Sequence, residues 1–163
     1  MKETLSASKI KTLKSCSWQY WCKYVLKLPD KTNSGALIGD TVHILLECLG
    51  ADKHKKHYDK IIKKKDIFAS KAIKRLVHKH AKRKNLNEED QIEDIKSMAL
   101  KGLMYDFFGK KFGNPTEVIC EKDFELVVEQ DDIAYKIKGF IDRLFIYGDH
   151  GFVLIRDYKT NKK

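Results

Sequence analysis

The sequence lacks a long apolar run, a paired cysteine motif and an apolar segment at its N-terminus. Every apolar run is far shorter than the roughly 20 residues that span a bilayer, so we expect no membrane partner. Met1–Thr4 lacks the apolar core of a secretion signal, so we expect a cytoplasmic protein of a bacterial, archaeal or virus-infected cell. The four cysteines form no CxxC pair, which disfavours a disulfide framework and favours buried thiols.

Proline is also scarce, with two residues in 163, whereas hydrophobic residues make up 42% of the chain. A chain with this apolar content and no low-complexity segment can bury a core, which excludes general disorder. At this length we expect a single domain over residues 1–163.

Positive charge is abundant, and one segment holds all of the excess. The formal net charge is +10; residues 51–84 contain 14 Lys or Arg against three acids, and the remainder contains 19 basic and 20 acidic residues. Such a localised basic stretch is typical of a surface that binds a phosphate backbone, with a solvated helical face as the alternative. The predicted nucleic-acid-binding residues are Lys63, Lys64, Lys71, Lys74, Arg75, Lys82 and Arg83, with Arg143 outside the segment.

Apolar residues recur at intervals of three and four through residues 1–113, which predicts a mostly helical part. The expected helices run from Ser6 or Ser8 to Pro29, from just after Gly39 to Gly50, across 54–84 with a break near Asp66, and over 87–112.

After residue 113 the apolar residues alternate instead, which predicts strands near 118–128, over 134–147 and from Phe152 onward. Turns are expected at 130–132 and 148–151. Helices followed by an antiparallel meander indicate an α+β fold, in which N-terminal helices pack on a three-stranded sheet within residues 116–160.

The last two strands can bring two acids together. A turn at 148–151 pairs residues symmetrically about its midpoint, which places Asp142 opposite Asp157 at about 5 Å between Cβ atoms. Lys159 lies two residues beyond Asp157 and therefore shares its face. Gly139 fits a strand position that a ligand approaches closely.

Hydrolysis of a phosphodiester needs carboxylates for a hard cation and a positive group for the nucleophile or the developing charge. Asp142, Asp157 and Lys159 provide these groups, with a routine ion pair at a strand end as the alternative. His43, one turn after Gly39, is either a nitrogen ligand to the metal or a core histidine. Glu121 is either a further carboxylate of the site or a surface acid.

Four motifs, in this order, resemble the RecB-type branch of the PD-(D/E)XK nuclease superfamily. They are Leu5–Ser8 leading to Cys16, Gly39 with His43, Gly139–Arg143, and Asp157–Thr160. This branch includes nuclease domains of helicase–nucleases, CRISPR adaptation nucleases, and mitochondrial or phage single-strand exonucleases. The resemblance spans nearly the whole chain and implies a restriction-endonuclease-like core.

The resemblance also implies roles for individual residues. His43, Asp142, Asp157 and the carbonyl of Tyr158 would bind Mg²⁺ or Mn²⁺, and Glu121 would be an accessory acid. Lys159 would orient or activate the attacking water and stabilise the pentavalent phosphate.

The expected function is therefore a metal-dependent DNA nuclease. We expect a single-strand exonuclease of DNA repair, recombination or phage and viral DNA processing, which threads its substrate past residues 51–84 and has a helicase or recombination partner. The alternatives are a structure-specific endonuclease and a module that binds nucleic acid or a helicase without cutting.

The sequence departs from the family in two respects. Family members continue beyond this motif into a helix that bears Gln and Tyr, whereas this chain ends at Lys163. We expect either a fragment or a short relative that a partner completes. Some relatives hold a 4Fe-4S cluster; Cys16 matches its early ligand, but no cysteine follows Cys120, so we expect no cluster.

Overall fold

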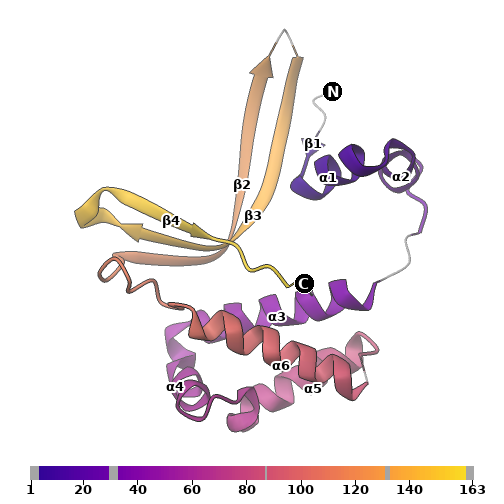
Figure 1. Ribbon diagram of the computed structural model, residues 1–163. Helices are drawn as coiled ribbons and strands as arrows, with labels where there is room; N and C mark the ends of the chain where they lie inside the picture. The colour runs from indigo at the N-terminus through magenta and orange to yellow at the C-terminus, as the bar shows by residue number, and fades with distance from the viewer. Residues whose placement is uncertain (1–3, 30–32, 87, 131–132, 161–163) are drawn as a thin grey trace. The chain divides into compact units, whose positions relative to one another are not determined.

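The computed structural model describes residues 4–29, 33–86, 88–130 and 133–160. These ranges contain six α-helices and a mixed sheet of four strands, which confirms the expected α+β class (Figure 1). The chain forms two compact units: Met1–Lys31 with Glu121–Ile141 (unit 1), and Thr32–Cys120 with Asp142–Lys163 (unit 2). The expected helix start at 87, part of the turn at 130–132 and the C-terminal residues 161–163 lie outside the described residues.

Unit 1 contains β1, two short α-helices, a π-helix and long parts of two strands. Their bounds are β1 Thr4–Leu5, α1 Ala7–Ser15, α2 Ser17–Tyr20 and the π-helix Trp21–Val25, with β2 (Glu117–Gln130) and β3 (Ile133–Tyr147) running through both units. β1 pairs in parallel with β3, Thr4 opposite Lys136. The sheet is therefore mixed and four-stranded, whereas the sequence predicted three antiparallel strands.

The predicted first helix is interrupted. Ser6 caps α1 as expected, because its side chain accepts a hydrogen bond from the Lys9 N–H. At Cys16 the backbone becomes extended, with φ −161° and ψ 108°, and the Cys16 thiol caps α2 by accepting from the Gln19 N–H at 3.4 Å. Cys16 is exposed, so the expectation of a buried thiol is wrong at this position.

Four helices form the core of unit 2. They are α3 (Ser34–Gly50), α4 (Lys55–Lys64), α5 (Lys71–Arg83) and α6 (Glu89–Met104). The expected break near Asp66 is confirmed, because Asp66 caps a short 3₁₀-helix, Ile67–Ala69, between α4 and α5. α3 begins earlier than expected and includes Gly39, while α6 ends at Met104 instead of continuing to residue 112.

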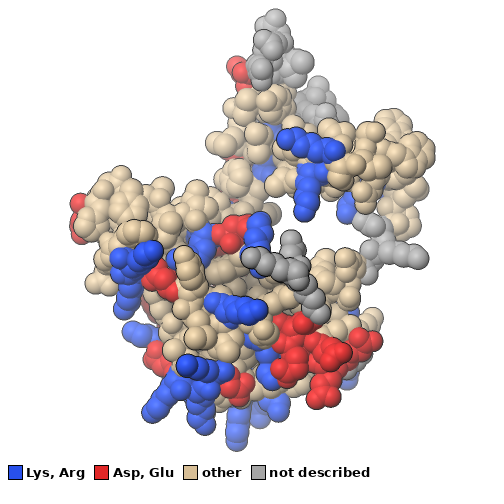
Figure 2. Space-filling model, in the orientation of Figure 1, with Lys and Arg blue, Asp and Glu red and all other residues tan. Residues whose placement is uncertain are grey.

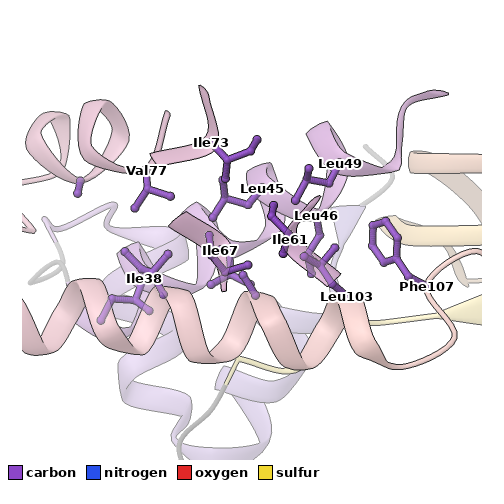
Figure 3. Close-up of a cluster of buried hydrophobic side chains, with 14 of the residues drawn as sticks. Ile38, Leu45, Leu46, Leu49, Ile61, Ile67, Ile73, Val77, Leu103 and Phe107 are labelled. Carbon is purple, nitrogen blue, oxygen red and sulfur yellow. The ribbon is translucent and has the colours of Figure 1, made fainter. Parts of the chain in front are cut away.

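The apolar faces of these helices meet in one cluster (Figure 3). Leu45, Leu46 and Leu49 of α3 are fully buried, as the helical spacing predicted. Within the described ranges, no one helix has both the length and the apolar composition of a membrane span. Only as a pair bent by 93° do Ser34–Gly50 and Asp52–Lys64 meet those two criteria.

The hairpin of β3 and β4 (Phe152–Arg156) confirms the predicted register. Tyr147 lies opposite Phe152, and the pairing continues to Arg143 opposite Arg156, symmetrically about the 148–151 turn. Gly151 closes this turn with φ 65°, a conformation that glycine adopts at no steric cost. The last paired residues therefore lie one position from Asp142 and Asp157.

Candidate active site

Asp142 is held from two sides by groups that the chain brings from distant positions. Its Oδ1 lies 3.3 Å from the Nδ1 of His43 on α3. Its Oδ2 accepts a hydrogen bond of 2.6 Å from the backbone N–H of Tyr158. The Asp142 side chain is only 11% exposed and that of His43 28%. The carboxylate is thus oriented before any ligand binds.

Asp157 and Lys159 follow directly after β4. Their side chains form an ion pair, and both stay accessible, with Asp157 53% and Lys159 78% exposed. The ion pair that the alternative interpretation predicted is therefore present. The exposed carboxylate of Asp157 and the exposed ammonium group of Lys159 flank Tyr158, whose backbone N–H binds Asp142.

Tyr158 ties this segment to the protein interior. Its ring meets the imidazole of His43 edge-on at a centroid distance of 6.4 Å. Its hydroxyl accepts a hydrogen bond from Arg143 Nη1 at 3.5 Å. Because its own N–H binds Asp142, one residue orients the buried carboxylate and fixes the path of Asp157 and Lys159.

Gly39 lets the C-terminal segment approach α3. A Cβ at this buried position would lie 2.6 Å from the Thr160 Oγ1 and 3.5 Å from its Cβ. We predicted Gly39 to lie just before the helix. Its position inside α3, one turn before His43, shows that it provides space for the residue after Lys159.

The family model of the PD-(D/E)XK nuclease superfamily matches residues 4–163. The chain belongs to this superfamily. No curated protein and no solved structure matches it with significance. The match confirms the superfamily predicted from the four motifs. Membership supports a nuclease that hydrolyses nucleic acid and binds a divalent metal. The RecB-type branch stays a prediction.

Replacing Gly39 by Ala in this superfamily member is expected to slow cleavage by about 10- to 100-fold, because small displacements of catalytic groups are costly. The added methyl group would push Thr160, and with it Lys159, out of position. Alanine in a helix interior is otherwise stabilising relative to glycine, so the melting temperature should not fall.

The double variant Gly39→Ala/Thr160→Ala removes the clashing hydroxyl and is expected to recover most of the activity. Only the Thr160 Cβ, at an ordinary contact distance of 3.5 Å, would face the new methyl group. A double-mutant cycle on initial cleavage rates measures the coupling. If the activity loss of the double variant equalled the sum of the losses in the two single variants, this contact would not position the site.

Arg143 is placed differently from the other predicted nucleic-acid-binding residues. It is 1% exposed, and its guanidinium lies 3.8 Å from the centroid of the Phe107 ring. Among the described residues, its Nε and Nη2 have no hydrogen-bond partner. The expectation of a direct phosphate contact is therefore corrected: this charge is enclosed by aromatic rings, and Arg143 instead supports the Tyr158 hydroxyl.

Glu121 follows Cys120 on β2 and is the first residue of this strand in unit 1. Its φ of 50° is unusual for a residue other than glycine and interrupts the regular strand geometry at this point. Its accessory role in catalysis stays a prediction.

The predicted basic surface lies on α4 and α5. All seven of its predicted nucleic-acid-binding residues are exposed. Figure 2 shows Lys and Arg along the lower edge, where α4 and α5 lie in Figure 1, and acidic side chains where α6 begins. Lys74 and Lys82 share a cavity with Glu89 and Glu93 of α6, so acidic side chains oppose part of the basic surface.

A separate cleft of about 640 Å³ adjoins the site within unit 2. Its lining residues are Val42, Leu46, Asp94, Ser97, Met98, Lys101, Gly102, Tyr105 and residues 156–160. Asp157 and Lys159 thus face a groove whose other wall is α6. This wall was not predicted from the sequence, although its polar residues repeat at helical spacing.

Proposed function

We propose that the protein is a metal-dependent deoxyribonuclease that hydrolyses phosphodiester bonds at single-stranded DNA ends. The observation that carries this proposal is the orientation of the Asp142 carboxylate by His43 and Tyr158, directly beside the exposed pair Asp157 and Lys159. Superfamily membership supports the reaction class.

The donor groups fit Mg²⁺ or Mn²⁺. We assign His43, Asp142, Asp157 and the Tyr158 carbonyl as ligands from their placement in unit 2, and we propose Glu121 as an accessory acid. Oxygen donors with one imidazole suit these ions, and 3.3 Å between His43 Nδ1 and Asp142 Oδ1 is near the roughly 3 Å between adjacent ligands of an octahedral ion. When bound, the ion would supply Lewis-acid stabilisation of the phosphate charge.

The chain's own residues then hold the reacting groups. Tyr158 keeps the Asp142 carboxylate fixed through its N–H, so the carboxylate does not have to reorient during the reaction. Lys159 orients the attacking water and stabilises the charge on the phosphate. A P–O bond to the water oxygen forms and the ester P–O bond breaks; the attacking water loses one proton to the solvent, and the departing oxygen gains one from it.

The basic residues of α4 and α5 support binding of the DNA backbone outside this site. A single-strand exonuclease with these properties suits DNA repair, recombination or phage DNA processing, in which a helicase supplies unwound ends. We expect it to act inside the cell.

Purified protein is expected to degrade linear single-stranded DNA in Mg²⁺ or Mn²⁺ and to lose this activity in EDTA. Linear duplex DNA should be cut more slowly, and circular single-stranded DNA should stay intact because an exonuclease needs an end. Gel analysis of end-labelled oligonucleotides measures all three. Cleavage of the circle would show an endonuclease, and binding without cleavage in either metal would contradict the hydrolysis.

A further inference from the structure

One face of α6 forms the cleft wall opposite Asp157 and Lys159. Its lining residues are Asp94, Ser97, Met98, Lys101, Gly102 and Tyr105. Their spacing of three and four residues places them on one side of the helix, while Ile95, Ala99 and Leu103 are buried on another. A Cβ at Gly102 would lie 3.1 Å from both terminal methyl groups of Leu46. Gly102 therefore lets α6 pack closely on α3, which supplies the cleft floor.

Tyr105 is an exposed aromatic residue whose position is nevertheless fixed. Its side chain is 69% exposed at the end of α6. Arg156 Nη1 donates to the carbonyls of Tyr105 at 3.3 Å and Asp106 at 2.6 Å. The same guanidinium lies 5.4 Å from the centroid of the Tyr105 ring. Arg156 thus anchors the backbone at Tyr105 and lies against its ring, which reduces the conformational freedom that is lost when a ligand stacks on the ring.

Charge along the cleft favours an anionic ligand near Tyr105. Lys101 is exposed on α6 one turn before Tyr105, and Lys159 is exposed on the other wall. Asp94, an acidic residue of the lining, lies 11 positions before Tyr105, which is roughly 16 Å along the helix axis. The other acid, Asp157, belongs to the proposed metal site.

We propose that this cleft binds the unpaired nucleotide next to the scissile phosphate, with Tyr105 stacking on its base and Lys101 contacting the adjoining phosphate. This inference rests on the proposed hydrolysis at Asp142, Asp157 and Lys159. The cleft volume of about 640 Å³ is typical of a site for a small ligand or a single nucleotide. A base inside a duplex is already stacked on both faces, so the wall selects single-stranded DNA.

Equilibrium binding in EDTA tests the inference without cleavage. We expect Tyr105→Ala to weaken binding of a fluorescein-labelled single-stranded 20-mer by about 5- to 150-fold, the range for loss of one base–aromatic stack. Tyr105→Phe keeps the ring and should bind within about twofold of the unaltered protein. Lys101→Ala should reduce the slope of log affinity against log salt concentration by about one, because one phosphate contact is lost.

Met104→Ala is the matched control, because Met104 is 55% exposed beside Tyr105 and does not line the cleft. Equal affinities of Tyr105→Ala and Met104→Ala would overturn the inference. The inference would also be overturned if Tyr105→Ala lost as much affinity for a duplex of the same sequence as it lost for the single strand. If Tyr105→Ala alone loses single-strand binding while the unaltered protein cleaves nothing, base stacking in the cleft is supported and the proposed hydrolysis beside it is contradicted.

Discussion

Asp142→Asn is expected to lower metal-dependent DNA cleavage by at least about 10³-fold. The substitution keeps the size of the side chain and an oxygen that can accept the hydrogen bond from the Tyr158 N–H. It removes the negative charge at the position where His43 Nδ1 lies 3.3 Å from Oδ1. Loss of this charge weakens the hold on a divalent cation while the surrounding chain keeps its path.

Initial rates on end-labelled single-stranded DNA measure the activity, and calorimetric titration with Mn²⁺ measures the loss of metal affinity. Asp149→Asn is the matched control, because Asp149 is an exposed acid in the turn of the same hairpin. The control should keep both activity and metal affinity. Cleavage by Asp142→Asn at the unaltered rate, with unaltered metal affinity, would contradict the assignment of the site.

The location of this carboxylate could be predicted because it depends on local rules. The turn at 148–151 fixes the pairing of β3 with β4, and alternation then fixes each opposite residue. The observed pairs, from Tyr147 opposite Phe152 to Arg143 opposite Arg156, follow that symmetry. The helical spacing around Leu45 and Leu49 likewise predicted the buried face of α3.

The features that the sequence did not predict depend on contacts between distant segments. β1 has only two residues and exists because Thr4 and Leu5 pair with β3, so no periodicity could indicate it. The burial of Arg143 depends on Phe107, which lies beyond the end of α6. Gly39 has a role only because Thr160 lies against it, some 120 positions along the chain.

The cleft beside the site follows the same pattern. Lys101 and Tyr105 carry no recognisable motif, and only the packing of α6 on α3 places them opposite Lys159. The basic segment, which the sequence favoured as the DNA path, contributes no residue to the lining of this cleft among the described residues. The backbone binding proposed for α4 and α5 and the nucleotide binding proposed for the cleft can therefore be tested separately.

Lys159→Ala is expected to reduce cleavage by at least about 10³-fold while single-stranded DNA still binds within about threefold. The side chain is 78% exposed and pairs with Asp157, itself 53% exposed. Exposed ion pairs contribute little to stability, so the melting temperature should stay unchanged. The loss therefore concerns the attacking water and the charge that develops on the phosphate.

Lys159→Arg separates charge from proton chemistry, because arginine keeps the positive charge but does not give up a proton near neutral pH. If Lys159 only stabilises charge, Arg at this position should restore much of the rate; if it activates the water, the rate should stay low. Lys110→Ala, an exposed lysine outside the cleft, is the control and should cleave normally. Cleavage by Lys159→Ala at the rate of this control would remove Lys159 from the mechanism and leave Asp142 and Asp157 to carry it.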